Sequence, residues 1–459
     1  MNTIRADVCV VGGGPAGSTL AARLAALGNS VVLVERAAFP RKHLGESLTP
    51  GVRPLLESIG AGDVFEKSGA LAVESVLLNW DGELRERIDP ESRGMLVDRG
   101  RFDTLLLKHA IAAGAKVLQP ASFRDCTTLA DGWRIRVEQG ETSICIDARF
   151  LADASGRSFV TRGRKRQTGA RTTSFYAYWE GSDLPKRPRI EAGSDCWYWG
   201  VPIPDGTYNT LVFVDPRTYS PDQLQELVAR SGLLAGCRDI HLDSPIQAAD
   251  ATPYIDEQSV THNSIKVGDA ALAIDPLSSS GVQKAIQTAL SAAVVVNTLL
   301  RKPESSEAAM QFYRSSLADA SERHCQWAGE YYGAAAASRN AEFWWRRASR
   351  SEPVEAAQPI AASNFADEPL TLSPRLTFVE LPCLEGEFVT LKSALRHPSL
   401  ERPVIFVGGC ELPPLVRRLR TGMKPMEIAL LWSNQVPIGT GLALTGWLIG
   451  KGLLICAAQ

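Results

Sequence analysis

Three glycines near the N-terminus stand at the spacing of a turn that binds a dinucleotide. Gly12, Gly14 and Gly17 follow an apolar run at residues 8–11, and a helical pattern comes next at residues 18–27. In such a turn the first glycine permits the tight bend and the second lets the backbone approach a pyrophosphate. The third lets helix and strand pack closely. The pattern therefore predicts a strand–turn–helix site for a dinucleotide.

An acidic residue stands where the ribose of that dinucleotide would lie. A second apolar strand at residues 31–34 ends in Glu35, whose carboxylate can accept hydrogen bonds from ribose hydroxyls. We expect Arg36 to line the same site. Pro15 and Ala16 lie at the start of the helix, where free N–H groups face an anion. Together these residues predict a βαβ unit built around a bound dinucleotide.

The composition places the protein among ordinary globular chains. It has 459 residues, 45% hydrophobic and 22% charged, with a net charge of −2. We therefore expect two or three domains and no nucleic-acid binding. Its nine cysteines are scattered, with no C-x-x-C pair and no zinc-like spacing. We expect no metal site and a reducing, cytoplasmic location. Because no run of about 18 apolar residues occurs, we also expect no membrane span.

Four short segments, taken in order, resemble one family. They are the glycine turn, Asp98-Arg99-x-x-Phe102-Asp103, Asp153-Ala154-Ser155-Gly156-Arg157, and Gly268-Asp269 followed by residues 275–281. Their order and spacing resemble the flavoprotein monooxygenases of the hydroxybenzoate-hydroxylase fold. Two further segments resemble the flavin-dependent halogenases and their relatives within that group. They are Gly45-Glu46-Ser47 and Trp197-Tyr198-Trp199-Gly200-Val201-Pro202, and the whole resemblance covers about residues 5–340.

The resemblance implies FAD as the cofactor and assigns roles to several residues. Arg99 would donate to the ribose or pyrophosphate, and Asp269 would bond the ribityl chain. The segment 275–281 would wrap the isoalloxazine, with helix N–H groups steadying negative charge on the ring. Asp153 lies under the nucleotide or is purely structural. The remaining cofactor-binding candidates are Ser47, Gly268, Pro276, Ser280, Gly281 and Val282, and the substrate-pocket candidates are Trp197, Trp199 and Pro202.

The elements that must position these residues give an α/β fold. We expect a Rossmann-like FAD-binding domain, an inserted antiparallel β-sheet substrate domain and a small C-terminal α+β domain. Strand-like alternation of aromatic residues over 171–262 predicts the inserted sheet, and an Asp81-Gly82 turn predicts a hairpin. The FAD-binding domain comprises 1–74, 98–170 and 263–350, the last with a helical extension. The substrate domain comprises the hairpin at 75–97 and residues 171–262. A linker at 351–369 and a C-terminal module at 370–459 follow.

One residue of the halogenase pattern is missing. The resemblance implies a lysine between flavin and substrate, eight residues before the tryptophan of an Asn-Trp pair. Here that pair is Asn79-Trp80 and the corresponding residue is Ala72, with no lysine between Lys67 and Lys108. This favours oxygen transfer over halogenation. Halogenation of an indole or phenol stays open as the alternative, through a lysine from elsewhere. Two further alternatives stay open: a flavin reductase of the geranylgeranyl-reductase type, and a flavoprotein that binds a partner without turnover.

Oxygen transfer needs dioxygen, a reductant and assistance from a base. In the family, reduced flavin and dioxygen form a C4a-hydroperoxide, whose distal oxygen is attacked by an electron-rich ring. The candidate bases are His43, Glu46 and Asp250. No second glycine fingerprint occurs in a strand–turn–helix context. NAD(P)H therefore binds transiently, or a separate flavin reductase supplies reduced flavin.

The relatives without the lysine suggest a substrate. They include flavoproteins that hydroxylate a tryptophan inside another polypeptide, a post-translational modification in the biogenesis of tryptophylquinone cofactors. The chain resembles the monooxygenases that mature the small subunit of quinohemoprotein amine dehydrogenase. This implies a small-subunit precursor of an amine dehydrogenase as the protein partner. The C-terminal module at 370–459 would dock that polypeptide, or would cap the fold or dimerise.

Overall fold

The computed structural model describes residues 2–88, 93–158, 160–348 and 368–457. The chain divides into two compact units, residues 1–306 with 310–350 and residues 307–309 with 351–459. The linker expected at 351–369 lies almost entirely outside the described residues. The two units are described separately below, beginning with the one that contains the glycine turn.

A seven-stranded sheet carries the glycine turn in the first unit. Its order is β8-β2-β1-β11-β10-β9, with β20 paired to β11. Strands β8, β2, β1, β11 and β20 run parallel, whereas β10 and β9 are antiparallel. The bounds are β1 (Asn2–Val11), β2 (Val31–Val34), β8 (Lys116–Leu118), β9 (Ser122–Leu129), β10 (Gly132–Gln139), β11 (Thr142–Asp153) and β20 (Ser264–Lys266). Parallel strands buried on both faces read as continuous apolar runs, and β2 is buried at all four residues.

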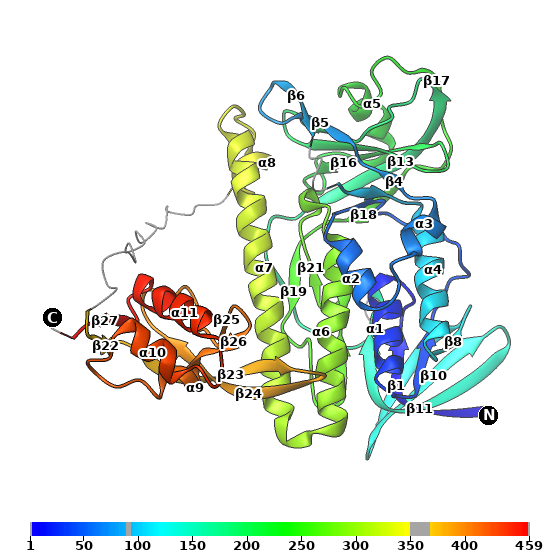
Figure 1. The fold of residues 1–459 in the computed structure, drawn as a ribbon. Coiled ribbons are helices and arrows are strands. Elements are labelled where there is room, and N and C mark those ends of the chain that lie inside the picture. Colours follow the sequence, from blue (N-terminus) through cyan, green and yellow to red (C-terminus); the bar gives the residue numbers. More distant parts are fainter. Residues whose placement is uncertain (1, 89–92, 159, 349–367, 458–459) are drawn as a thin grey trace. The chain divides into compact units, whose positions relative to one another are not determined.

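Helices pack beside this sheet and frame its carboxyl edge. α1 (Pro15–Ala26) contacts both α4 (Arg99–Ala112) and α6 (Gly281–Arg301). α6 runs beside the long α7 (Ser306–Ala336), which precedes the short α8 (Glu342–Trp345) (Figure 1). Smaller elements complete this part: α2 (Val52–Ser58), α3 (Val64–Ser68), β3 (Ser47–Leu48), β4 (Leu71–Ala72), β7 (Met95–Leu96), β12 (Lys165–Gln167), β19 (Tyr254–Asp256) and β21 (Leu272–Ala273).

A second, eight-stranded sheet stands at the other end of this unit (Figure 1). Its order is β17-β13-β16-β15-β14-β5-β6, with β18 paired to β13, and all pairs are antiparallel except β14 with β5. The bounds are β5 (Ser75–Asn79), β6 (Leu84–Ile88), β13 (Thr173–Ser182), β14 (Arg189–Ala192), β15 (Trp197–Pro202), β16 (Tyr208–Val214), β17 (Arg238–Leu242) and β18 (Gln247–Asp250). α5 (Leu224–Ala229) contacts β16. The predicted α/β fold class, with a Rossmann-like domain and an inserted antiparallel sheet, is confirmed.

A buried aromatic cluster joins this sheet to the end of α7. Trp197 stacks on Phe213 with ring centroids 3.8 Å apart and planes inclined by 9°. Trp80 meets Trp197 edge-on at 6.3 Å and Trp344 at 5.5 Å. Tyr332 of α7 lies in the same cluster, 6.1 Å from Trp344. Such offset and edge-to-face pairs fix the sheet against the helix through large apolar contact areas.

The second unit has a core of its own. Its elements are β22 (Leu370–Leu372), β23 (Thr377–Glu385), β24 (Phe388–Arg396), β25 (Phe406–Val407), β26 (Cys410–Glu411), α9 (Leu412–Val416), α10 (Pro425–Leu431), α11 (Ile438–Gly450) and β27 (Leu454–Cys456). Leu412, Trp432 and Leu448 are fully buried in one cluster. β23 and β24 form an antiparallel hairpin, and β22 pairs with β27. The unit is therefore a small α+β module.

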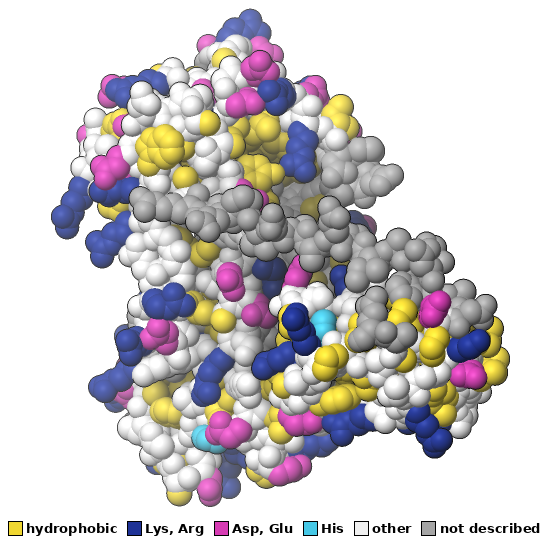
Figure 2. Space-filling model, turned by 90° about the vertical axis from the view of Figure 1, so that its left-hand side faces the viewer, with side chains coloured by type: hydrophobic (Ala, Val, Ile, Leu, Met, Phe, Trp, Pro, Cys, Tyr) yellow, Lys and Arg dark blue, Asp and Glu magenta, His cyan; other side chains and the backbone are white. Residues whose placement is uncertain are grey.

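The described residues contain neither a membrane-spanning helix nor a cluster of metal ligands. No helix there is long and apolar enough to cross a membrane. Within the same ranges, no group of three or more His, Cys, Asp or Glu side chains is placed to hold a metal ion. On the face shown in Figure 2, basic and acidic side chains are interspersed.

Candidate active site

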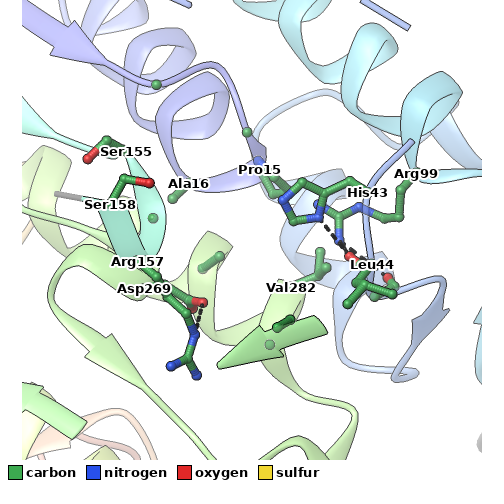
Figure 3. Close-up of a pocket in the computed structure, with 18 of the residues that line it drawn as sticks. Pro15, Ala16, His43, Leu44, Arg99, Ser155, Arg157, Ser158, Asp269 and Val282 are labelled. Carbon is green, nitrogen blue, oxygen red and sulfur yellow. Dashed lines mark hydrogen bonds and ion pairs between the residues drawn. The ribbon is translucent and has the colours of Figure 1, made fainter. Parts of the chain in front are cut away.

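A cavity of about 950 Å³ opens inside the first unit, between the carboxyl edge of the parallel sheet and the antiparallel sheet. Its nucleotide end is lined by the glycine turn and its far end by Trp197 and Trp199. In Figure 3, His43 and Arg99 lie on one side of the cavity, and Arg157 and Asp269 lie on the other.

The glycine turn has the geometry of a phosphate cradle. Gly12 has φ +111°, and a Cβ built there would lie 2.3 Å from the carbonyl oxygen of Ala154. A Cβ at Gly17 would lie 1.8 Å from the Gly12 carbonyl oxygen, so helix and strand approach too closely for any side chain. Gly14 differs, because the nearest atom to its Cβ position is a guanidinium nitrogen of Arg41 at 3.9 Å. The space beside Gly14 is open and adjoins a cation, which fits a pyrophosphate.

Glu35 is held rigidly at the end of β2. Its Oε2 accepts the Gly13 N–H at 2.6 Å and its Oε1 accepts the Ala37 N–H at 2.8 Å. The carboxylate is buried yet lines the cavity, so each oxygen keeps a further lone pair for a ribose hydroxyl. Arg36 also lines the cavity and is exposed. Both residues therefore lie on the cavity wall, beside the glycine turn.

Arg99 holds the loop that faces the glycine turn. Its buried guanidinium donates to both carboxylate oxygens of Asp103, at 3.0 and 3.1 Å. It also donates to the carbonyl oxygens of Leu44 and Gly45 (Figure 3). Arg99 lines the cavity, but these donors are already used inside the protein. In the structure, Arg99 fixes the loop that contains Leu44 and Gly45, a role that the sequence did not predict.

Asp269 lies at the cavity with two cations beside it. Its Oδ1 accepts from the Lys284 ammonium at 2.5 Å, and its Oδ2 lies 3.7 Å from Nε of Arg157. Burial opposes the charged form, but Lys284 and Arg157 outweigh it and hold the pKa of Asp269 below its usual range. Asp269 is thus an ionised acceptor at the predicted ribityl position. Lys284 was missed by sequence reasoning, although a lone lysine on the buried face of a helix was the available signal.

The start of α6 faces the cavity with part of the predicted loop. Pro276, Gly281 and Val282 line it, as do Ser47 and Gly268. Ser279 turns the chain with φ +50°. Ser280 does not line the cavity, because its N–H and hydroxyl are both bonded to Ser278. The helix start can therefore approach a flavin ring through Gly281 and Val282 rather than through Ser280.

Three more of the predicted residues lie outside the cavity wall. Gly17 packs α1 on the turn, as described above. Asp153 is fully buried, and its two oxygens accept bonds from Ser155, Val160 and Thr161, so it shapes the loop after β11. Pro202 lies on the opposite face of β15 from the two tryptophans, because side chains alternate along a strand. The bonds of Asp153 favour the structural one of its two expected roles, and Pro202 does not line the cavity as the pocket prediction expected.

The loop before β3 brings two of the candidate bases to the cavity. Glu46 is buried, and its Oε1 accepts from the Tyr178 hydroxyl at 2.6 Å and from the Asn209 amide at 3.0 Å. Burial raises the pKa of Glu46, while the Tyr178 hydrogen bond acts against the rise. For His43, burial and the nearby Arg99 cation lower the pKa of the imidazole. Both residues line the cavity.

The far end of the cavity is aromatic. Trp197 and Trp199 share one face of β15 and line it together with Phe213. Two residues beyond the predicted pocket set also lie here, Tyr176 of β13 and Asp275. Asp275 is buried and accepts a hydrogen bond from the Tyr332 hydroxyl. Apolar walls with few polar groups fit an aromatic ring that must be kept from water.

The position corresponding to the halogenase lysine lies away from this cavity. Ala72 is in β4, is exposed, and does not line the cavity. In the part of the chain that the structure describes, Lys42 is the one lysine on the cavity wall. Its side chain is 62% exposed and pairs with Asp243 at 2.7 Å.

Comparisons with known proteins show what this chain is similar to. A family model described as an FAD binding domain matches residues 5–179. The tryptophan 2-halogenase of Chondromyces crocatus is 32% identical over 338 residues, covering 67% of this chain and 64% of the halogenase. The chain thus spans less than two thirds of that relative's length.

Two solved structures match nearly the whole chain. One is the peptidyl tryptophan dihydroxylase QhpG, essential for tryptophylquinone cofactor biogenesis. It has a TM-score of 0.77 and 25% identity, covering 98% of this chain and 100% of QhpG. The flavin-dependent halogenase CmlS has the same fold, with a TM-score of 0.76, 20% identity and coverage of 98% and 96%. The chain belongs to the FAD-dependent oxidoreductases of the monooxygenase and halogenase family, whose members use reduced flavin and dioxygen.

Proposed function

We propose that this protein is an FAD-dependent monooxygenase that hydroxylates an aromatic ring, and that the ring is a tryptophan within a polypeptide. The modification would serve the biogenesis of a tryptophylquinone cofactor, with a small-subunit precursor of an amine dehydrogenase as substrate. The likeness to the peptidyl tryptophan dihydroxylase over the full length of both chains supports the substrate class. A transient NAD(P)H or a separate reductase would supply electrons.

Hydroxylation is favoured because, among the described residues, no lysine sheltered from water lies on the cavity wall. A lysine that captures hypohalous acid must stand between flavin and substrate, away from water. Ala72 is exposed in β4, and Lys42 is largely in solvent and paired with Asp243. A paired, hydrated ammonium is poorly placed to transfer halogen to a buried ring. Oxygen transfer needs no such residue.

The residues present fit FAD. Gly14 and the start of α1 would hold the pyrophosphate, and Glu35 the adenosine ribose. Asp269 would bond the ribityl chain. Bound and reduced FAD would supply activation of dioxygen. Around it, the stacked pair Trp197 and Phe213 excludes water and presents flat apolar surface to a substrate ring.

The second unit is our candidate for docking the polypeptide. It folds around its own core, and Arg417, Arg418 and Arg420 follow directly after α9. However, CmlS is also matched over nearly the whole chain. The module by itself therefore does not separate a protein hydroxylase from a halogenase, and the function must be tested on products.

Halogenation is the second candidate, because a specific observation favours it. Trp197 and Trp199 both face the cavity, in a segment that resembles the halogenases, and the tryptophan 2-halogenase is the curated relative described above. A halogenase of this kind would need an indole or phenol and a halide. Its product would carry bromine when bromide is supplied.

One experiment separates the two. The FAD-loaded protein is mixed with an extract of its source organism, a reductant, isotopically labelled dioxygen and bromide, and captured polypeptides are weighed intact. We expect a polypeptide with labelled oxygen on a tryptophan, located by fragmentation. A bromine isotope pattern would establish halogenation instead. Oxygen consumption with unmodified polypeptides would point to a free small aromatic and would overturn the peptide assignment.

A further inference from the structure

We infer that Asp275, held by Tyr332, is the base that takes the ring N–H proton of the substrate indole. The inference rests on the proposed function and names the group that handles the proton in it. Asp275 is on the cavity wall beside Leu277, which packs in the same aromatic cluster as Trp197. It therefore stands at the substrate end rather than at the nucleotide end.

The carboxylate of Asp275 is oriented from two sides. Its Oδ1 accepts the Leu277 N–H at 3.0 Å, which starts the turn before α6. The hydroxyl of Tyr332 lies 3.1 Å from Oδ1 and 3.2 Å from Oδ2. Tyr332 is itself 1% exposed and fixed by the rings around it. Oδ2 has no other protein donor in the described residues, so it retains capacity for a substrate N–H.

The other carboxylates of the cavity are less suitable. Glu46 is already bonded by Tyr178, Asn209 and the Gly45 N–H. Asp250 is 66% exposed at its side chain and pairs with Arg157 at 3.4 Å. A hydrated, paired carboxylate is a weaker base than a buried one. Asp275 combines burial, an apolar wall and a free lone pair.

Burial raises the pKa of Asp275 above its usual range. The Leu277 N–H, the Tyr332 hydroxyl and the charge of Arg347 act in the opposite direction. A raised pKa makes the ionised carboxylate a stronger base. Asp275 can therefore take the proton at pH values above its pKa, and this ability is lost as the pH falls through that pKa.

The proposed step balances as follows. The indole N–H bond breaks, and its proton passes to Oδ2 while the electron pair stays in the ring. A ring carbon forms a bond to one oxygen atom of dioxygen and the O–O bond breaks. The two electrons that reduce the other oxygen atom to water come from reduced FAD. When the ring regains aromaticity it loses its C–H proton, and Asp275 returns its own proton to nitrogen. The C–H proton and the two hydrogens of reduced FAD together account for the hydroxyl hydrogen of the product and the two hydrogens of water.

A binding test uses the FAD-loaded protein and two probes, N-acetyl-tryptophanamide and its 1-methyl derivative. The methyl group replaces the N–H that Asp275 would accept. We expect the methylated probe to bind wild-type protein about tenfold more weakly, because a buried carboxylate is left unpaired. Asp275→Leu should bind both probes equally. Equal affinity in the wild type, or no binding of either probe, overturns the inference.

An activity test separates this inference from the proposed function. We expect Asp275→Asn to retain FAD and to lose about 100-fold or more in product formation. Asp319→Asn, at an exposed position of α7 away from the cavity wall, is the control and should stay within about twofold of wild type. Tyr332→Phe should move the acid limb of the pH profile upward by roughly one unit, a shift that a purely structural role would not produce. Undiminished product from Asp275→Asn removes the inference alone. Absence of labelled product from the wild type removes the proposed function and the inference with it.

Discussion

At the scale of single residues, the ion pair of buried Lys284 and half-buried Asp269 decides how the cofactor end of the cavity works. The Lys284 ammonium is 3% exposed and also donates to the carbonyl oxygen of Leu272. Its bond fixes Oδ1 of Asp269 and with it the direction in which Oδ2 faces a ligand. An ionised oxygen in a fixed direction is a selective acceptor for a hydroxyl group. The pair therefore adds orientation to the ribityl contact proposed for Asp269.

Replacing Gly14 with valine tests the phosphate cradle. The backbone of Gly14 has φ −70°, which valine adopts without strain, and the space at its Cβ is open. We therefore expect Gly14→Val to fold, with stability within about 1 kcal/mol of wild type, but to lose FAD because the side chain fills the pyrophosphate position. The absorbance of the purified protein measures bound flavin. A fully yellow variant would contradict the cradle.

Local chemistry could be predicted from the sequence, whereas distant partners could not. The glycine turn, Glu35 and the Asp269 position depend on neighbours in the chain, and each lines the cavity. Tyr332 reaches Asp275 across 57 residues, and this contact exists only because α7 packs on the aromatic cluster. The role of Asp153 could not be predicted, because an aspartate at the end of a strand can accept hydrogen bonds either from the following loop or from a ligand. Only the bonds that it accepts separate the two roles.

At the scale of elements, the alternation of β15 sets the wall of the cavity. Trp197 and Trp199 face it, while Tyr198 packs in the core on the other side of the sheet. The aromatic alternation predicted this sheet. The alternation did not predict that α8 contacts this sheet. In the structure, the indole N–H of Trp344 donates to the Ser194 carbonyl oxygen at 2.8 Å. Short helices after a long one carry little periodicity from which to infer such a contact.

Two adjacent tryptophans offer a matched test of that contact. Trp344 is fully buried, whereas its neighbour Trp345 is 58% exposed. We expect Trp344→Ala to lower the free energy of unfolding by about 3–5 kcal/mol, and Trp345→Ala to change it by less than about 0.5 kcal/mol. Denaturant titration of the FAD-loaded proteins measures both. Similar values for the two variants would show that α8 does not brace the sheet.

At the scale of the whole molecule, the chain is two units with separate cores. Because the cavity is lined wholly by the first, removal of residues 366–459 should leave FAD binding unchanged. We expect product formation on a polypeptide substrate to fall about tenfold or more if the module supplies even 1.4 kcal/mol of docking energy. Flavin content and product mass are measured on the same preparation. Full turnover on the intact partner would remove the docking role.

The loop at residues 42–47 links α4 to the antiparallel sheet of the first unit, because Arg99 of α4 donates to the carbonyl oxygens of Leu44 and Gly45. Glu46 is anchored to Tyr178 of β13 and Asn209 of β16, and Lys42 is anchored to Asp243. The Glu46 bonds are buried whereas the Lys42 pair is exposed, so Glu46 is the firmer anchor of this loop on the cavity wall. Replacing Glu46 would therefore loosen a wall of the cavity as well as remove a carboxylate from it, so a loss of activity in such a variant would not by itself mark Glu46 as a base.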